Sequence, residues 1–154
     1  MDNASYISGF VDGEGSFLVS FQKRAKMSTG IEARPSFTIS QHRRNKEILF
    51  QICEYLGCGG IRFNKSDQTY KYEVRSLKEL LYKIIPHFTK FPLQTSKAND
   101  FEKFKLICGL MKENKHRSLS GIRETIELAY SMNNFGARRY EKALLLKIVD
   151  KMKV

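Results

Sequence analysis

The stretch Tyr6-Ile-Ser-Gly-Phe-Val-Asp-Gly-Glu-Gly-Ser16 combines a helical pattern with acids and glycines that an ordinary core helix avoids. Ser5, Gly9 and Gly13 recur every four residues here and therefore share one face of the helix. Because that face carries no bulky side chain, a second backbone can approach it closely. The spacing predicts a short helix whose small-residue stripe (Ser5, Gly9 and Gly13) is an interface.

Two carboxylates, Asp12 and Glu14, come at the end of this predicted helix. The helix dipole leaves negative charge at a C-terminus, which disfavours a carboxylate there by roughly 0.3–1 kcal/mol. A cation is therefore expected nearby, and a divalent metal ion is the natural candidate.

The chain is strongly basic. Its 154 residues include 27 Lys and Arg against 16 Asp and Glu, for a net charge of +11. This balance favours nucleic acid as a partner over a merely solvated basic surface or a membrane surface. The basic residues lie mostly in predicted strands, and no signal peptide or apolar run of about 18 residues is present, so no membrane association is expected.

Cys53, Cys58 and Cys108 are an odd number without paired metal-ligand spacing. A zinc site is therefore not expected. The positions of Cys53 and Cys108 on apolar helix faces predict buried free thiols and a reducing, intracellular compartment.

Hydrophobic periodicity predicts the order α-β-β-α-β-β-α, followed by further helices, in one domain over residues 1–154. The fold class is α+β, with a four-stranded antiparallel sheet and helices on one face. The predicted strands are 17–23, 31–41, 60–64 and 69–75. The second predicted helix is capped by Asn45 and stops at Gly57. The third is capped by Ser76 and stops at Pro86. Three further helices are predicted over 96–112, 120–132 and 137–152.

Strand alternation places polar and basic side chains on the sheet face away from the helices. They are Leu18, Ser20, Gln22, Arg24, Glu32, Arg34, Ser36, Thr38, Ser40, Arg62, Asn64, Lys71, Glu73 and Arg75. A β-ribbon can enter the DNA major groove, where such side chains hydrogen-bond base edges. An antiparallel sheet that is simply wet on one side explains the pattern equally well.

Further segments carry a family resemblance. Ile7-Ser-Gly-Phe-Val-Asp-Gly-Glu-Gly15 resembles the signature helix of the LAGLIDADG homing endonucleases, and Ser16-Phe17 follows it directly. The segments Phe37-Thr-Ile-Ser-Gln41 and Phe91-Pro-Leu-Gln-Thr-Ser-Lys-Ala-Asn-Asp-Phe101 resemble the family in the same order. Asn114-Lys-His116, Gly121-Ile122 and Met132-Asn133 extend the resemblance over most of the chain.

The resemblance implies the LAGLIDADG endonuclease fold and assigns roles to several residues. Glu14 is the expected metal ligand, helped by the Gly13 carbonyl, while Asp12 is expected to be structural. Gln41 is expected to position the attacking water, and Lys97 to stabilise the transition state, with Lys90 as second choice. Mg²⁺ is the expected cofactor, and Ca²⁺ or Mn²⁺ are the expected substitutes in vitro.

Two positions depart from the homodimeric branch of the family. There the catalytic lysine aligns with Gln94 and its companion arginine with Asn45. Arg43, Arg44 or Lys46 are therefore alternative basic partners. His42 and Arg43 are expected to contact DNA near the cleavage point, whereas His87 and His116 are expected at the surface or in loops.

One Glu14 carboxylate does not hold a pair of metal ions, so a homodimer packed through Ser5, Gly9 and Gly13 is expected. The implied activity is metal-dependent, site-specific cleavage of double-stranded DNA at a long, near-palindromic target. The resemblance further implies an intron-encoded protein of a mitochondrion, a chloroplast or a prokaryotic cytoplasm. The alternatives are an RNA maturase that binds its intron RNA, a non-cleaving DNA-binding protein, and a subunit that pairs with a different chain.

Overall fold

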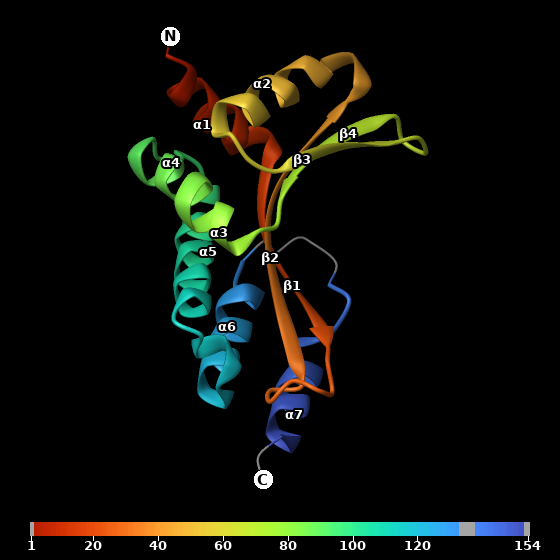
Figure 1. Ribbon diagram of the computed structural model, residues 1–154, viewed down its shortest axis with the longest axis vertical. Helices are drawn as coiled ribbons and strands as arrows, with labels where there is room; N and C mark the ends of the chain where they lie inside the picture. The colour runs from red at the N-terminus through yellow and green to blue at the C-terminus, as the bar shows by residue number, and fades with distance from the viewer. Residues whose placement is uncertain (1, 133–137, 153–154) are drawn as a thin grey trace. The chain divides into compact units, whose positions relative to one another are not determined.

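The computed structural model describes residues 2–132 and 138–152 (Figure 1). Its elements are α1 (Asn3–Glu14), β1 (Gly15–Lys23), β2 (Ile31–His42), η1 (Arg43–Asn45), α2 (Lys46–Leu56), β3 (Gly60–Asn64), β4 (Thr69–Val74), α3 (Leu77–Glu79), η2 (Leu80–Ile84), α4 (Ile85–Lys90), α5 (Lys97–Lys112), η3 (Lys115–Arg117), α6 (Leu119–Tyr130) and α7 (Lys142–Lys151). The strands form one sheet in the order β1-β2-β4-β3. The predicted α+β class and element order are confirmed.

Contacts divide the chain into two compact units. The first comprises Met1–Phe17 and Ser36–Ala98, and the second comprises Leu18–Pro35 and Asn99–Val154. Strands β1 and β2 each contribute to both units. The single domain expected for residues 1–154 remains a prediction.

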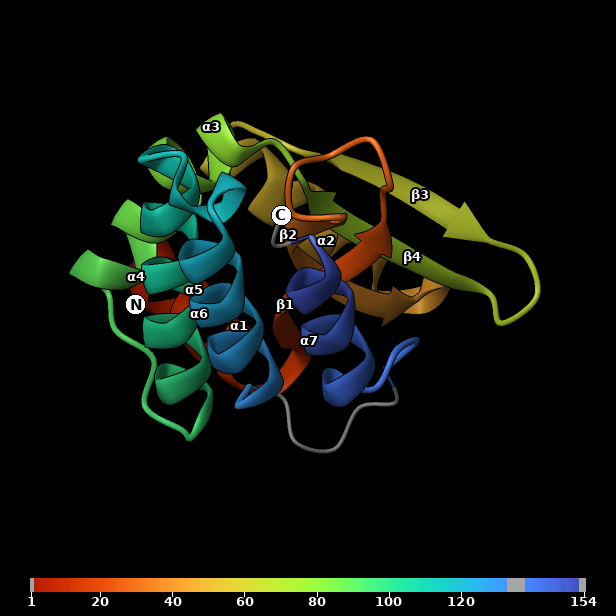
Figure 2. The ribbon, with the colours of Figure 1, turned by 90° about the horizontal axis from the view of Figure 1, so that it is seen from below.

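An aromatic cluster forms the core of the first unit. Phe17 lies with its ring centroid 5.1 Å from that of Phe37 and 5.5 Å from that of Phe88. Tyr72 meets Phe37 edge-on, and all four side chains are at most 1% exposed. In this unit β4 pairs antiparallel with both β2 and β3, and α2 packs on the β3–β4 hairpin (Figure 2).

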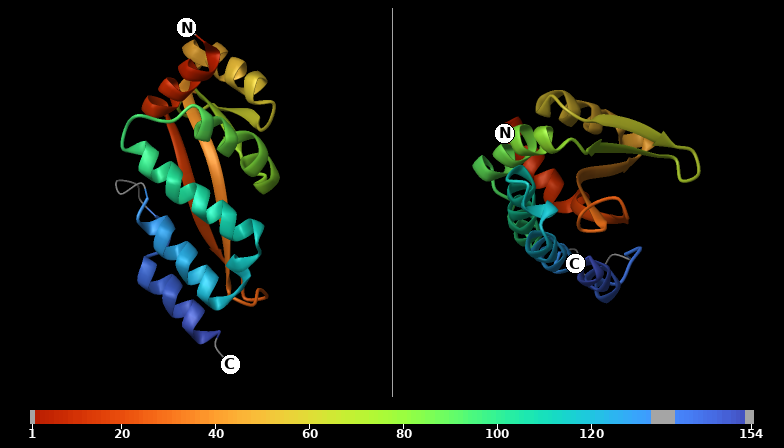
Figure 3. Two further views of the ribbon diagram at one scale, coloured as in Figure 1. Left: turned by 90° about the vertical axis from the view of Figure 1, so that its left-hand side faces the viewer. Right: turned by 60° about the horizontal axis from the view of Figure 1, so that its bottom comes forward.

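In the second unit α5, α6 and α7 run side by side (Figure 3). Their apolar stripes bury Phe104, Ile107, Ile122, Ile126, Leu145 and Val149 completely. Arg138 is also integrated into this unit, since its guanidinium donates to the Val19 and Ala129 carbonyls and stacks on the Tyr130 ring.

Several element boundaries differ from the predictions. Pro86 does not end a helix. The π-helical turn η2 precedes it, and Pro86 lies in the first turn of α4, where its missing N–H is tolerated. Asn45 makes no side-chain cap bond to the described residues. Instead, a 3₁₀ turn intervenes and the His42 side chain accepts from the Arg44 N–H.

The last two helices are shorter than predicted. α6 ends at Tyr130 rather than 132, and α7 begins at Lys142 rather than 137. Residues 133–137, which carry the predicted helix end and the next helix start, lie outside the described residues. None of the helices in the described ranges has the length and hydropathy needed to cross a bilayer.

Candidate active site and nucleic-acid interface

Glu14 is the last residue of α1, and β1 starts at the next residue. The abrupt change of direction depends on Gly15, because a Cβ there would lie 2.7 Å from a Val11 methyl group. Glu14 is exposed, and its Oε2 accepts a hydrogen bond from Gln41 Nε2 on β2 at 3.1 Å. The structure thus brings together the predicted metal ligand and the predicted water-positioning residue.

Lys97 contacts the end of the same helix. Its Nζ donates to the carbonyl oxygens of Val11 at 2.9 Å and Asp12 at 3.1 Å. The Asp12 carbonyl is among those that an α-helix leaves without intrahelical partners, whereas the Val11 carbonyl also accepts from the Gly15 N–H at the helix end. A protein cation therefore satisfies part of the charge requirement that the sequence alone had assigned to a metal ion.

Asp12 fixes the loop that leads into α5. Its carboxylate accepts from the Gln94 N–H at 2.8 Å, the Thr95 N–H at 3.1 Å and the Thr95 hydroxyl at 2.8 Å. Desolvation raises the pKa of Asp12, but the hydrogen bonds from Gln94 and Thr95 outweigh it and hold this pKa below its ordinary value. Asp12 has the structural role expected for it.

The remaining basic candidates lie around η1. Arg44 and Asn45 line a surface hollow of about 320 Å³ together with Gln41, Tyr6, Phe10, Glu47 and Ile48. Arg44 therefore shares a surface with the Glu14–Gln41 pair. Gln94 instead bonds Asp12 through its backbone and the Pro92 carbonyl through its side chain.

The donors at the end of α1 suit a hard divalent cation. Glu14 offers an exposed carboxylate, and Gly13 a carbonyl from the last turn of the helix. Oxygen ligands of this kind, completed by water and phosphate, are those that Mg²⁺ prefers. Within residues 2–132 and 138–152, no three His, Cys, Asp or Glu side chains gather at one place.

In the first unit, β3 and β4 have the exposed polar face that strand alternation predicts. Arg62, Asn64 and Arg75 are exposed, and Lys71 and Glu73 are partly exposed. A hollow of about 450 Å³ lies on it, lined by Ser40, Arg62, Phe63, Asn64, Lys65, Asp67, Thr69 and Lys71. Lys65 and Thr69, which line this hollow and flank the hairpin turn, were not among the predicted residues. For Lys65, the basic charge next to a strand end was the available signal.

Thr38 differs from this prediction because it is only 6% exposed. It lies on β2 directly opposite Glu73 of β4, inside the sheet rather than at an edge. A short side chain between two strands is covered by its longer neighbours, so alternation alone overestimates its exposure. Ser36 is partly exposed and Ser40 is exposed, as predicted.

In the second unit, Leu18 and Ser20 are exposed and Gln22 partly so. Glu32 accepts from Arg24 Nε at 2.8 Å and from Arg34 Nη2 at 3.3 Å. The Arg24 hydrogen bond is the main reason why the pKa of Glu32 is lowered.

The histidines divide into three environments. His42 is exposed, as expected next to the site. His87 is only 8% exposed, so its predicted surface position is wrong: three aromatic rings and Ser8 enclose it. His116 is half-buried, and among the described residues its Nδ1 has no hydrogen-bond partner.

Of the predicted buried thiols, Cys108 is fully buried but Cys53 only partly. All three cysteines are free.

The sequence that builds this site also matches a known protein family. The family model of the LAGLIDADG endonuclease matches residues 7–108, from the glycine-striped helix through most of α5. The chain belongs to the LAGLIDADG endonuclease family.

Two relatives illustrate the range of sequence identity and coverage. "Probable intron-encoded endonuclease 2" of Neurospora crassa is 36% identical over 132 residues, which is 85% of this chain and 29% of that protein. DNA endonuclease I-CeuI of Chlamydomonas moewusii is 26% identical over 118 residues, 74% of this chain and 54% of that protein. The chain thus spans about a quarter to a half of the length of such curated relatives.

Solved structures show the same fold. The archaeal intron-encoded homing endonuclease I-Vdi141I, complexed with DNA, superposes with a TM-score of 0.89 at 32% identity over 97% of this chain and 95% of that chain. The I-LtrWI LAGLIDADG homing endonuclease bound to target DNA gives a TM-score of 0.82 at 36% identity, over 86% of this chain but 44% of that chain.

Proposed function

We propose that this chain is an intron-encoded, site-specific endonuclease of double-stranded DNA that acts as a homodimer with a divalent metal ion. The observation that carries the proposal is the Glu14–Gln41 contact, 3.1 Å long, at the exposed end of the glycine-striped helix. It combines a metal-binding carboxylate with a polar side chain able to orient water. The names of the relatives point the same way.

Mg²⁺ is the proposed metal, with the Glu14 carboxylate and the Gly13 carbonyl as its protein ligands. When bound, such an ion supplies Lewis-acid stabilisation of the phosphate and a hydroxide-like nucleophile. One structural relative, I-SmaMI, is known bound to an uncleaved DNA target in the presence of calcium ions. Mn²⁺ is a further substitute to test in vitro.

Gln41 and Lys97 have distinct proposed roles. The Gln41 amide donates to Glu14 through Nε2, so its Oε1 can accept from the attacking water and aim it at phosphorus. Lys97 donates to two carbonyls at the end of α1, and its proposed role is to stabilise the negative charge that develops on the phosphorane. Arg44 and Lys90 are the alternative residues for stabilising the negative charge of the transition state.

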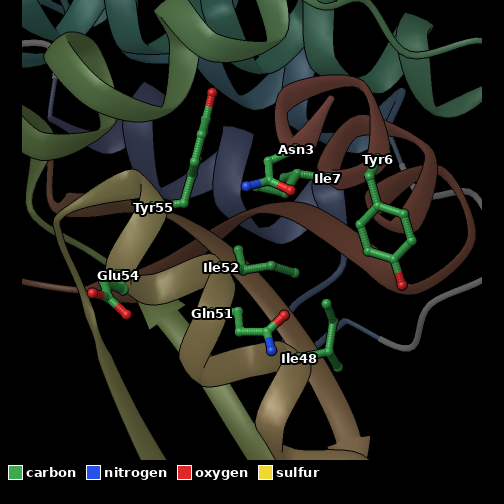
Figure 4. Close-up of a pocket in the computed structure, with 8 residues that line it drawn as sticks. All are labelled: Asn3, Tyr6, Ile7, Ile48, Gln51, Ile52, Glu54 and Tyr55. Atoms are coloured by element: carbon green, nitrogen blue, oxygen red, sulfur yellow. The ribbon is translucent and has the colours of Figure 1, made fainter. Parts of the chain in front are cut away.

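The small-residue stripe supports the homodimer. Ser5, Gly9 and Gly13 are all exposed, and a Cβ built on Gly9 or Gly13 meets no described atom within 4 Å. Beside the stripe, α1 and α2 form an open groove of about 310 Å³ that includes Tyr6 and Tyr55 (Figure 4). A second copy across the stripe would bring two Glu14 carboxylates to one axis.

The chain lengths of the structural relatives also support two copies of this chain per enzyme. The chain covers 95% of the I-Vdi141I chain but under half of the I-LtrWI and I-SmaMI chains. The longer chains have room for a second domain as large as this whole chain. Two such copies would bind a near-palindromic target of about two helical turns.

The polar strand faces are the proposed DNA-binding surface. Arg and Gln side chains are expected to bond base edges, while His42, Arg43 and Lys65 are proposed to bond phosphates. Relatives described as intron proteins, such as the one in ND4 intron 1 of Podospora anserina, support an intron origin and an organelle or a prokaryotic cell as the place of action.

The first test is cleavage selection. Purified protein with Mg²⁺ is mixed with a library of randomised near-palindromic duplexes, and the cut ends are sequenced, with Ca²⁺ as the non-cleaving control. A recovered two-fold target with paired breaks supports the proposal. Tight binding of DNA or intron RNA without cutting would replace it by a DNA-binding protein or a maturase.

The second test replaces the proposed metal ligand. Glu14→Gln should lower cleavage at least about 10³-fold and leave target binding equal or tighter, because a carboxylate facing phosphate is removed. The matched control is Glu102→Gln, the same charge change at an exposed position on α5. Cleavage by Glu14→Gln at the rate of Glu102→Gln would refute the metal assignment.

A further inference from the structure

One acid lies among three basic side chains on the polar face of the first unit. Glu73 on β4 approaches Arg62 at 3.7 Å, Lys71 at 3.9 Å and Arg75 at 3.5 Å. The Glu73 side chain is 15% exposed, whereas those of Arg62 and Arg75 are 66% and 68% exposed. The carboxylate is therefore at the base of the cluster, and the guanidinium groups extend outward.

Strand register explains this arrangement. Glu73 pairs across the ladders with Thr38 on β2 and Gly60 on β3. Both neighbours are short, and a Cβ built on Gly60 meets no described atom within 4 Å. The Glu73 side chain thus has only short side chains directly beside it on the neighbouring strands. Arg62 and Lys71 form the cross-strand pair two residues along on the same face, and from there their cationic groups reach Glu73.

The distances leave the cations available for DNA. Each arginine approaches Glu73 with one nitrogen, Nη2 for Arg62 and Nε for Arg75, at more than 3.4 Å. An arginine has five N–H donors in a fixed fork, so most donors of both residues remain for base edges. Because both arginines are about two-thirds exposed and no pair is shorter than 3.5 Å, the ion pairs are expected to contribute little to stability.

We propose that Glu73 is a positioning residue for sequence recognition: it draws Arg62, Lys71 and Arg75 together above the sheet so that they meet base edges rather than phosphates. Phosphate contacts carry no sequence information, whereas guanine is read by an arginine fork. Without Glu73, three like charges repel one another and turn to the phosphates, which attract them at any sequence. The inference rests on the proposed DNA endonuclease function.

A direct contact of Glu73 is the competing role on the same surface. A carboxylate can accept from the amino group of cytosine, which would specify a single base pair. Positioning instead affects several adjacent base pairs, because three side chains lose their common anchor. The two roles therefore leave different patterns in a target profile.

The experiment compares target profiles of wild type, Glu73→Gln and the control Glu102→Gln, using the selected target and a scrambled duplex of equal length. For Glu73→Gln we expect the ratio of specific to non-specific binding to fall about 10-fold or more. Non-specific binding should tighten, and its salt dependence should steepen by up to about one phosphate equivalent. Information should be lost over several adjacent base pairs.

Three results would overturn the inference. A profile equal to that of Glu102→Gln would leave Glu73 without a role in recognition. Loss of cytosine preference at one base pair would make it a direct contact. An equal loss of binding to all duplexes together with a lower melting temperature would make it structural. Failure of wild-type protein to select any target would instead refute the proposed function.

Discussion

At the scale of single residues, the Ser8–His87 pair joins α1 to α4. The Ser8 hydroxyl donates to the Phe91 carbonyl at 2.6 Å, so its oxygen can only accept from His87 Nε2 at 3.2 Å. This assigns the neutral imidazole with its proton on Nε2. Burial lowers the pKa of His87, and the rings of Tyr55, Phe88 and Phe91 around it offer no charge to offset that effect.

This environment predicts a pH-dependent stability. In the unfolded chain His87 takes up a proton near its ordinary pKa of 6.5, whereas in the folded chain it is protonated only at lower pH. The free energy of unfolding is therefore highest above pH 6.5 and decreases as the pH falls below that value. His87→Phe should flatten the fall in melting temperature between about pH 6.5 and 5. His116, whose pKa burial also lowers, should leave a residual slope.

Tyr55→Phe is the matched control, because it keeps the aromatic ring against His87 and leaves every histidine in place. It should retain the wild-type dependence of melting temperature on pH. An unchanged slope in His87→Phe would show that protonation of His87 is not coupled to folding.

At the scale of elements, the connection between α2 and β3 depends on two glycines with different constraints. Gly57 ends α2 with φ +69°, and a Cβ there would approach the mobile end of Lys83 at 3.4 Å. Gly59 has φ +78°, and a Cβ there would lie 2.7 Å from both the Glu73 carbonyl oxygen and a Val74 methyl group. Only Gly59 combines left-handed backbone with contact against a neighbouring strand.

Alanine substitutions should separate these two constraints. Gly57→Ala should lower the free energy of unfolding by about 1–2 kcal/mol, the cost of a left-handed conformation for an L-residue. Gly59→Ala adds steric overlap against β4 and should lower it by about 3 kcal/mol or more. Urea unfolding measures both, and equal losses would contradict the packing of β3 against β4 at this point.

At the scale of the whole molecule, the proposed function requires two copies. Gly9→Leu should place a side chain in space that is open in the single chain but occupied in the dimer. The chain should keep the far-UV circular dichroism spectrum of the folded wild type, while sedimentation or light scattering should show a monomer with cleavage reduced at least about 100-fold. The reason is that close helix packing through glycine tolerates no added side chain.

Gly109→Leu on α5 is the control, because a Cβ there also meets no described atom within 4 Å. It should leave the oligomeric state and cleavage unchanged. A dimeric, active Gly9→Leu protein would exclude the small-residue stripe as the interface.

Local patterns determined much of this protein in advance. Alternation along β1 and β2, the stop of α2 at Gly57 and the acid at the end of α1 all follow from neighbours in the chain, because each depends on helix or strand period or on backbone conformation. The family motif around Glu14 added the expectation that Gln41 would lie near it, and the two side chains do meet.

Only the tertiary structure decided which distant residues meet. It buried His87 against Ser8, covered Thr38 within the sheet and directed Lys97 to the carbonyls at the end of α1. It also assembled the cluster around Glu73 through the pairing of β4 with short residues on both sides. Periodicity reports which face a residue occupies, but strand register and helix packing set its neighbours, and these depend on contacts far apart in the chain.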